Sequence, residues 1–183
     1  KYQTFRIKDL IYNPFFIEIL KSQILNNKNL NALINFDVKN VYDFDRFSDL
    51  SLKLRIEEGN YNFSDSNIIW KENVNVRFLD ASLIFDKEKI NFNGRTSLDV
   101  KNKDQFYRFF QIKKELRKNI GKIELDFNYD LNEQKITFDN LKIDNQSNKK
   151  IEKLISNFNT SNKKFLNKIT FKNFVNDILI AYF

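Results

Sequence analysis

Carboxylates are the only side chains in this chain with obvious potential for metal binding or acid–base chemistry, because it contains no His and no Cys. The missing Cys excludes disulfides and thiolate nucleophiles, and the missing His excludes a Ser-His-Asp triad and imidazole metal ligands. Segments 126–130 and 43–45 have the alternating acids of a calcium loop, but lack the Gly and Glu expected at its sixth and twelfth positions. We therefore predict no catalytic residue, cofactor or metal site, and expect a protein that is not an enzyme.

The strongest pattern in the chain is strict alternation of apolar and polar residues, which predicts strands with one apolar face. It runs through residues 50–57, 90–100 and 122–131, and Gly94 inside the second run predicts a bend or bulge. The candidates for the apolar face are Leu50, Leu52, Leu54, Ile56, Phe92, Leu98, Ile123, Leu125 and Phe127. These side chains can line an open groove for acyl chains, or they can pack under helices as an ordinary core.

Shorter extended segments accompany these runs. We predict strands around residues 5–7, 30–38, 61–70, 74–85 and 136–143, with a turn at residues 58–60 and a bulge near Asn140. Residues 15–25 are ambiguous, with helix slightly preferred after Pro14.

Helical spacing replaces alternation over residues 104–120, with Asp104 as the expected N-cap and Gly121 as the stop. The face with Phe106, Phe109 and Phe110 is expected to dock on the sheet. The basic surface of this helix would carry Arg108, Lys113, Lys114, Arg117 and Lys118. Two more amphipathic helices are predicted near the end, one over residues 151–158 and one capped by Thr170.

These elements predict an α+β fold, a long, twisted, groove-like antiparallel meander with amphipathic helices packed on it. We expect residues 1–29 to lead in from a longer chain, since there is no Met at the start or elsewhere. Residues 30–147 would form the β-sheet domain with the inserted helix 104–120, and residues 148–183 a C-terminal helical segment.

The net charge of +7 is unevenly distributed. Segment 101–122 has eight basic and two acidic residues, and segment 149–172 has seven basic and one acidic residue. Nucleic acid is one possible partner for such segments, but their aromatic residues have the spacing of a core, so we predict none. An anionic membrane surface is a second possible partner, because each nearby Lys or Arg adds about 1 kcal/mol of attraction.

Segment 99–114, DVKNKDQFYRFFQIKK, resembles the C-terminal region of AsmA-like proteins. The order of further short motifs agrees over most of residues 30–176. They are EEG at 57–59, IIWK at 68–71, FNG at 92–94, Arg117-Lys118, FNY at 127–129, DNLKID at 139–144 and NKITFKNF at 167–174.

The resemblance implies a periplasmic domain of an inner-membrane-anchored protein in a Gram-negative cell envelope, with the anchor outside this fragment. It implies a greasy β-groove that contacts phospholipid acyl chains during lipid transfer between inner and outer membrane, and a part in outer-membrane biogenesis. An alternative is a protein-interaction module that docks an envelope partner through a sheet edge or the C-terminal helix.

Overall fold

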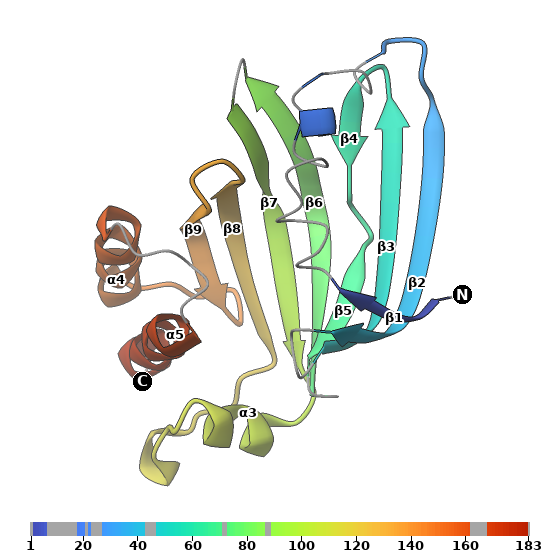
Figure 1. Ribbon diagram of the computed structural model, residues 1–183. Helices are drawn as coiled ribbons and strands as arrows, with labels where there is room; N and C mark the ends of the chain where they lie inside the picture. Colours follow the sequence, from blue (N-terminus) through green and yellow to red (C-terminus); the bar gives the residue numbers. More distant parts are fainter. Residues whose placement is uncertain are drawn as a thin grey trace.

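One twisted sheet dominates the computed structural model, which describes residues 2–6, 18–20, 22, 27–42, 47–70, 73–86, 89–161 and 168–182. The described strands are β1 (Tyr2–Arg6), β2 (Ala32–Tyr42), β3 (Phe47–Glu57), β4 (Asn60–Asn62), β5 (Asn67–Trp70), β6 (Val74–Asp86), β7 (Lys89–Val100), β8 (Lys122–Asp130) and β9 (Lys135–Ile143). They form a nine-stranded sheet in the order β1-β2-β3-β4-β6-β7-β8-β9, with β5 between β3 and β6 (Figure 1).

Every pairing is antiparallel except that of β1 with β2, which is parallel. Strand β6 has 13 residues and β7 has 12, longer than the common strand of about five or six. The β3–β4 turn has positive φ at Glu58 (51°) and Gly59 (80°), the conformation that suits a two-residue hairpin. The predicted α+β class with a long twisted meander is confirmed.

The bulge predicted near Asn140 is present, whereas the one predicted at Gly94 lies in the partner strand β6. In β6, Leu79 is the extra residue, because Phe78 pairs with Thr96 and Asp80 already pairs with Arg95. Gly94 lies opposite Ala81, just beyond this bulge. In β9 the register with β8 shifts at Asn140, which has a φ of 50°. Each bulge returns the following apolar residues to the same face of the sheet.

The predicted helix over residues 104–120 is wrong in its extent. Helix α3 covers only Lys103–Phe109, and the segment continues as a short 3₁₀ helix, η1 (Lys114–Leu116). After the helix ends, Gln111 has a φ of 57°. The Gln111 N–H donates a hydrogen bond to the Arg108 carbonyl, and the Ile112 N–H donates one to the Tyr107 carbonyl. This arrangement is a Schellman motif, and it buries Ile112 against the core. In a continuing helix, the Ile112 side chain would point away from Phe106 and Phe110.

The helix caps differ partly from the prediction. Asn102, not Asp104, caps α3, since its side chain accepts the Gln105 N–H. Helix α4 (Lys149–Thr160) is capped by Asn148 and buries Ile151, Ile155 and Phe158, as its spacing predicted. Helix α5 (Lys168–Tyr182) begins before Thr170, so that residue is not its cap. Most of the ambiguous segment 15–25 lies outside the described residues, apart from a helical turn at residues 18–20.

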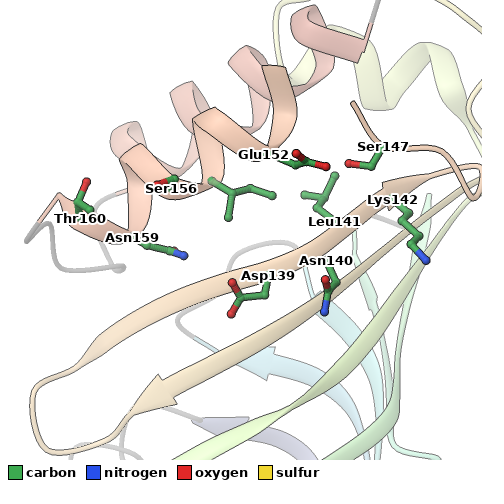
Figure 2. A pocket seen from close by; sticks show the side chains of 10 residues that line it. Asp139, Asn140, Leu141, Lys142, Ser147, Glu152, Ser156, Asn159 and Thr160 are labelled. Atoms are coloured by element: carbon green, nitrogen blue, oxygen red, sulfur yellow. The ribbon is translucent and has the colours of Figure 1, made fainter. Parts of the chain in front are cut away.

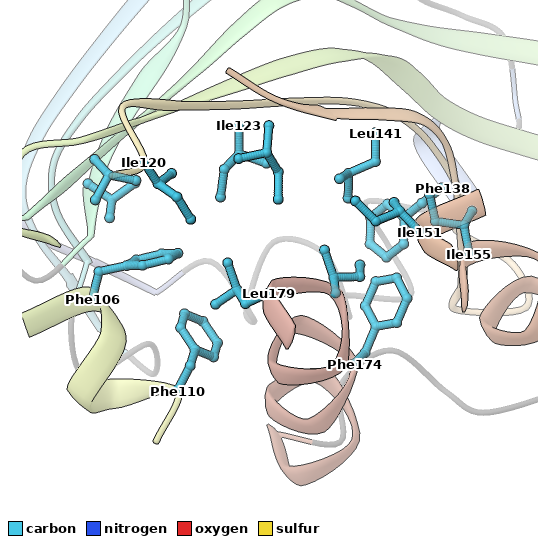
Figure 3. Packing of buried hydrophobic residues seen from close by; sticks show 14 of the residues in the cluster. Phe106, Phe110, Ile120, Ile123, Phe138, Leu141, Ile151, Ile155, Phe174 and Leu179 are labelled. Carbon is cyan, nitrogen blue, oxygen red and sulfur yellow. The ribbon is translucent and has the colours of Figure 1, made fainter. Parts of the chain in front are cut away.

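The helices and the sheet share one hydrophobic core. Figure 1 shows α4 and α5 beside the β9 side of the sheet and α3 at one end of the strands. Figure 3 shows the packing, in which α3 contributes Phe106 and Phe110, and α5 contributes Phe174 and Leu179, against apolar side chains of the sheet. The rings of Phe138 in β9 and Phe174 stack with centroids 5.6 Å apart. The described parts of segment 148–183, α4 and α5, therefore share the core of the β-sheet domain.

Candidate functional site

The apolar side chains of the sheet lie on one continuous face. One row of paired residues crosses six strands and consists of Ile56, Tyr61, Leu83, Phe92, Tyr129 and Ile136. A second row consists of Ile68, Val76, Leu98, Ile123 and Ile143. Because directly paired residues point to the same side of a sheet, the register alone makes this face continuous from β3 to β9.

All nine predicted residues belong to this face, and they divide into two groups by burial. Leu50, Ile56, Ile123 and Phe127 are buried. The half-buried ones are Leu52, Leu54, Phe92, Leu98 and Leu125. The buried members act as core. The half-buried members leave part of their apolar surface open, and Ile34, which pairs with Leu54 from β2, is 48% exposed.

Four phenylalanines form an aromatic cluster at the centre of the face. The Phe92 ring lies 5.4 Å from Phe63, 5.8 Å from Phe78 and 5.2 Å from Phe127, measured between centroids. Phe63, Phe78 and Phe92 are half-buried, whereas Phe127 is buried. Tilted and edge-on rings at these separations attract one another beyond the area that they bury. The cluster is a rigid apolar floor with part of its surface accessible.

The opposite face of the sheet is polar and is crossed by ion pairs. Arg77 contacts Asp99 at 2.8 Å, and Arg95 contacts Asp126 at 2.9 Å, each across neighbouring strands. Burial raises the pKa of Asp126, but hydrogen bonds from Asn140 and Arg95 outweigh it, so the net pKa lies below the ordinary value. These ion pairs neutralise one another's charge. The polar face is therefore better suited to contact with water than to binding an apolar ligand.

The predicted basic helix surface does not exist as one helical face. Arg108 is the one member of that set on α3, Lys114 lies on η1, and the others lie in the connection to β8. Arg117 is half-buried, and its Nε donates to the Ile112 carbonyl at 3.0 Å while its guanidinium lies over the Tyr107 ring. Arg117 is therefore a structural residue, whereas Arg108, Lys113, Lys114 and Lys118 are exposed.

The β9 edge of the sheet is closed by a side chain that sequence reasoning missed. Asn159 of α4 accepts the Phe138 N–H at 3.0 Å and donates to the Phe138 carbonyl at 2.8 Å. Its amide thus imitates a further strand and protects the edge from pairing. The sequence gives no signal for this role, because Asn is abundant and the contact spans 21 residues.

A cleft of about 460 Å³, lined by both polar and apolar side chains, lies beside this contact, between α4 and β9 (Figure 2). Asp139 and Lys142 line it from the strand, and Glu152 and Asn159 line it from the helix. Within the described residues, no three carboxylates come together in a group that could hold a metal ion. The cleft therefore offers mixed polar contacts without a concentrated charge.

The family prediction receives no support or contradiction from known proteins. Comparisons with protein-family models, with curated proteins and with solved structures give no match. In the part of the chain that the structure describes, no helix is long and apolar enough to cross a membrane. The sheet and its apolar face define an α+β protein with a partly accessible apolar surface. The relation of this chain to AsmA-like proteins stays a prediction.

Proposed function

We propose that this chain is a non-enzymatic lipid-binding domain whose half-buried apolar sheet face contacts phospholipid acyl chains. The observation that carries the proposal is the continuous apolar face, which remains partly open at Leu52, Leu54, Phe92, Leu98 and Leu125 although α3, α4 and α5 are docked on the fold. Open apolar surface in a folded domain is typical of a binding site. Each methylene group that leaves water contributes about 0.8 kcal/mol, so a single acyl chain gains substantially from such a surface.

Together with the AsmA-like motifs, this surface supports a role in phospholipid transfer between inner and outer membrane and in outer-membrane biogenesis. In this proposal the domain is periplasmic and belongs to an inner-membrane-anchored protein. The apolar face supplies a path for the acyl chains, and no bond is made or broken.

Site-specific photo-crosslinking tests the proposal. A benzophenone amino acid at Leu52 or Leu54 is expected to capture phospholipid in cells, because both side chains are half-buried on the apolar face. The matched controls place it at Lys53 or Arg55, which alternate with them along β3 and are exposed. Equal capture from the control positions, or capture from those positions alone, would refute binding by this face.

Native mass spectrometry supplies a second readout. The purified chain is expected to retain lipid, and Leu98→Glu is expected to lose it, because a charge on the half-buried face opposes acyl-chain contact. Asn91→Glu places the same charge on the polar side of β7 and is expected to leave lipid binding intact. Lipid retained by a folded Leu98→Glu variant would contradict the proposal.

A protein-docking function is favoured by one observation, the exposed first half of β2. Among the described strands, β1 pairs with β2 from Val38 onward, so residues 32–37 have β3 as their described neighbour. Leu33 is 62% exposed there. The β9 edge is blocked by Asn159, and α5 buries Phe174, Ile178 and Leu179, so neither matches β2 as a docking site. Loss of a co-purifying protein in Leu33→Arg, with lipid retained, would favour this alternative.

A further inference from the structure

The connections at the two ends of the strands carry different charge. One end of the sheet is formed by the ends of β7 and β9 and the starts of β6 and β8, since Val74 pairs with Val100 and Ile123 pairs with Ile143. The long β7–β8 connection with α3 and η1 leaves from this end. At the other end, the described residues around the connections after β3, β6 and β8 include Glu57, Glu58, Asp86, Asp130 and Glu133 against Lys89 and Lys135.

The structure brings the two basic segments of the sequence together at the α3 end. Lys118 Nζ donates to the Tyr182 carbonyl at 3.4 Å, which joins the β7–β8 connection to the end of α5. The Asn148 side chain donates to the neighbouring Ala181 carbonyl at 3.1 Å, which joins the start of α4 to the same place. Lys149 and Lys150 follow Asn148 directly, so they lie at the same end as the lysines of the connection.

We call this surface the basic end and define it by Arg108, Lys113, Lys114, Lys118, Lys149 and Lys150. All six residues are exposed. The exposed acids in the same elements are Asp104, Glu115, Glu152 and Asp177. Asp104 lies 3.7 Å from Arg117, and Glu152 lines the cleft against β9. The six exposed basic residues outnumber these four acids. The basic end therefore retains a positive surface.

We propose that the basic end docks the domain on an anionic phospholipid bilayer, with the ends of the strands toward the membrane surface. Charge complementarity selects the partner, because clustered lysines are attracted to anionic headgroups. Nucleic acid is the less suitable polyanion, since Phe106, Tyr107 and Phe110 are buried and unable to stack on bases. The acidic residues at the far end make that end the less favourable one for contact with the same bilayer.

The proposal goes beyond acyl-chain binding, because it specifies where the domain meets a membrane and how the apolar face is oriented there. Strands that end on the bilayer extend their apolar face away from it, so a lipid leaving the headgroup layer would meet that face end-on. Binding of vesicles by the basic end and binding of lipid by the apolar face are measured separately.

Vesicle flotation with charge-reversal variants tests the docking. Lys113, Lys114, Lys149 and Lys150 are changed together to Glu; Lys118 is kept because it contacts Tyr182. The matched control changes the exposed Lys39, Lys53, Lys89 and Lys142 to Glu, which lie on β2, β3, β7 and β9 and give the same net charge. Vesicles contain phosphatidylcholine with or without 30% phosphatidylglycerol.

The unchanged protein is expected to bind the anionic vesicles, to bind neutral vesicles weakly, and to dissociate as salt is raised. Each lysine near an anionic surface corresponds to about a fivefold gain in partitioning. With four lysines removed, the basic-end variant is therefore expected to lose about 600-fold or more in partitioning, and the control much less.

Equal losses in the two variants would overturn the proposal, because net charge alone would then explain binding. Binding that is independent of salt or of anionic lipid would also overturn it, as would binding to a single-stranded oligonucleotide without binding to vesicles. Circular dichroism shows that both variants are folded. Lipid retained in native mass spectra by a basic-end variant that no longer binds vesicles would separate the docking from the acyl-chain site.

Discussion

Gly94 is the position where the fold is most sensitive to a single added methyl group. A Cβ there would lie 1.9 Å from the Asp80 carbonyl oxygen and 2.5 Å from Ala81 Cα. Both atoms belong to the backbone of the bulged strand β6, so no side-chain rotation relieves the contact. Gly94 also has a φ of 157°. Gly94→Ala therefore requires β6 and β7 to separate.

The size of the effect follows from these distances. Ordinary carbon–oxygen contact requires a displacement of at least about 1 Å, which exceeds the tolerance of the adjoining N–H···O bonds. Loss of two ladder hydrogen bonds costs about 2 kcal/mol, and overpacking costs a further 1–3 kcal/mol in typical cores. We expect Gly94→Ala to lower the free energy of unfolding by about 4 kcal/mol, a large part of the stability of a typical domain.

Gly121→Ala is the matched control. Its Cβ would meet only the Asp144 side-chain oxygen, at 3.3 Å, a contact that a shift of a few tenths of an ångström relieves. Urea unfolding followed by Trp70 fluorescence measures both variants, because Trp70 is the single tryptophan and packs edge-on against Phe109 in the core. A loss below 1 kcal/mol for Gly94→Ala, or equal losses for the two variants, would refute the argument from close backbone approach.

Three further predictions concern polar side chains that hold the helices and the β7–β8 connection in place. Asn159→Ala is expected to lower the free energy of unfolding in urea by about 2 kcal/mol. It is also expected to increase aggregation, measured by light scattering, because it uncovers the backbone edge at Phe138. Unchanged aggregation would contradict the edge role. Asn148→Ala is expected to cost about 1 kcal/mol, since Asn148 caps α4 and holds α5, whereas Lys149→Ala is expected to be neutral. Burial raises the pKa of Tyr107 to about 12, so the folded state holds this proton more tightly than the unfolded chain, and about 2 kcal/mol of stability is expected to disappear between pH 10 and pH 12. Tyr107→Phe should lack this loss in pH-dependent unfolding, and an identical pH profile for the two proteins would contradict it.

The sheet was predictable from the sequence because its physical cause is local. Alternation over residues 50–56 directly reports a strand with one buried and one solvated face, and the register then confirms which residues share that face. The bulge at Asn140 was predictable for the same reason, since it interrupts the alternation in β9, whereas Gly94 lies in the strand opposite the bulge of β6. Whether a given leucine is core or open surface was not predictable, because that depends on where the helices dock.

The helix over residues 104–120 shows where local spacing misleads. Its apolar residues fit a helical period, but Ile112 is stabilised by a different arrangement, in which the chain reverses at Gln111 and buries Ile112 with Tyr107. A Gly at position 111 would have signalled this end, since Gly is the usual residue at a left-handed helix terminus. With Gln in that position, the tertiary contacts decide the conformation and the sequence pattern does not reveal it.

The same dependence on tertiary structure governs the charge. In the sequence the basic residues form two separate segments, and each resembles a solvated helix face. The contacts of Lys118 with Tyr182 and of Asn148 with Ala181 place both at one end of the strands. An electrostatic attraction to a surface depends on how many charges lie within a Debye length of it, about 8 Å at physiological salt. In the proposed docking, the two modest segments act as one site because these contacts hold them at the same end of the strands.

The two long edges of the sheet are also unequal, and this limits how the apolar face can be extended. Asn159 closes the β9 edge, and α5 covers the neighbouring apolar side chains, including Phe138. On the β2 side, Leu33 and Ile34 remain exposed, and Ile34 continues the row that begins with Leu54. A longer apolar surface can therefore be built by adding a strand at β2 and not at β9. If the face conducts acyl chains, its continuation lies on the β2 side, and Ile34→Glu should reduce lipid capture at Leu54 more than at Leu125.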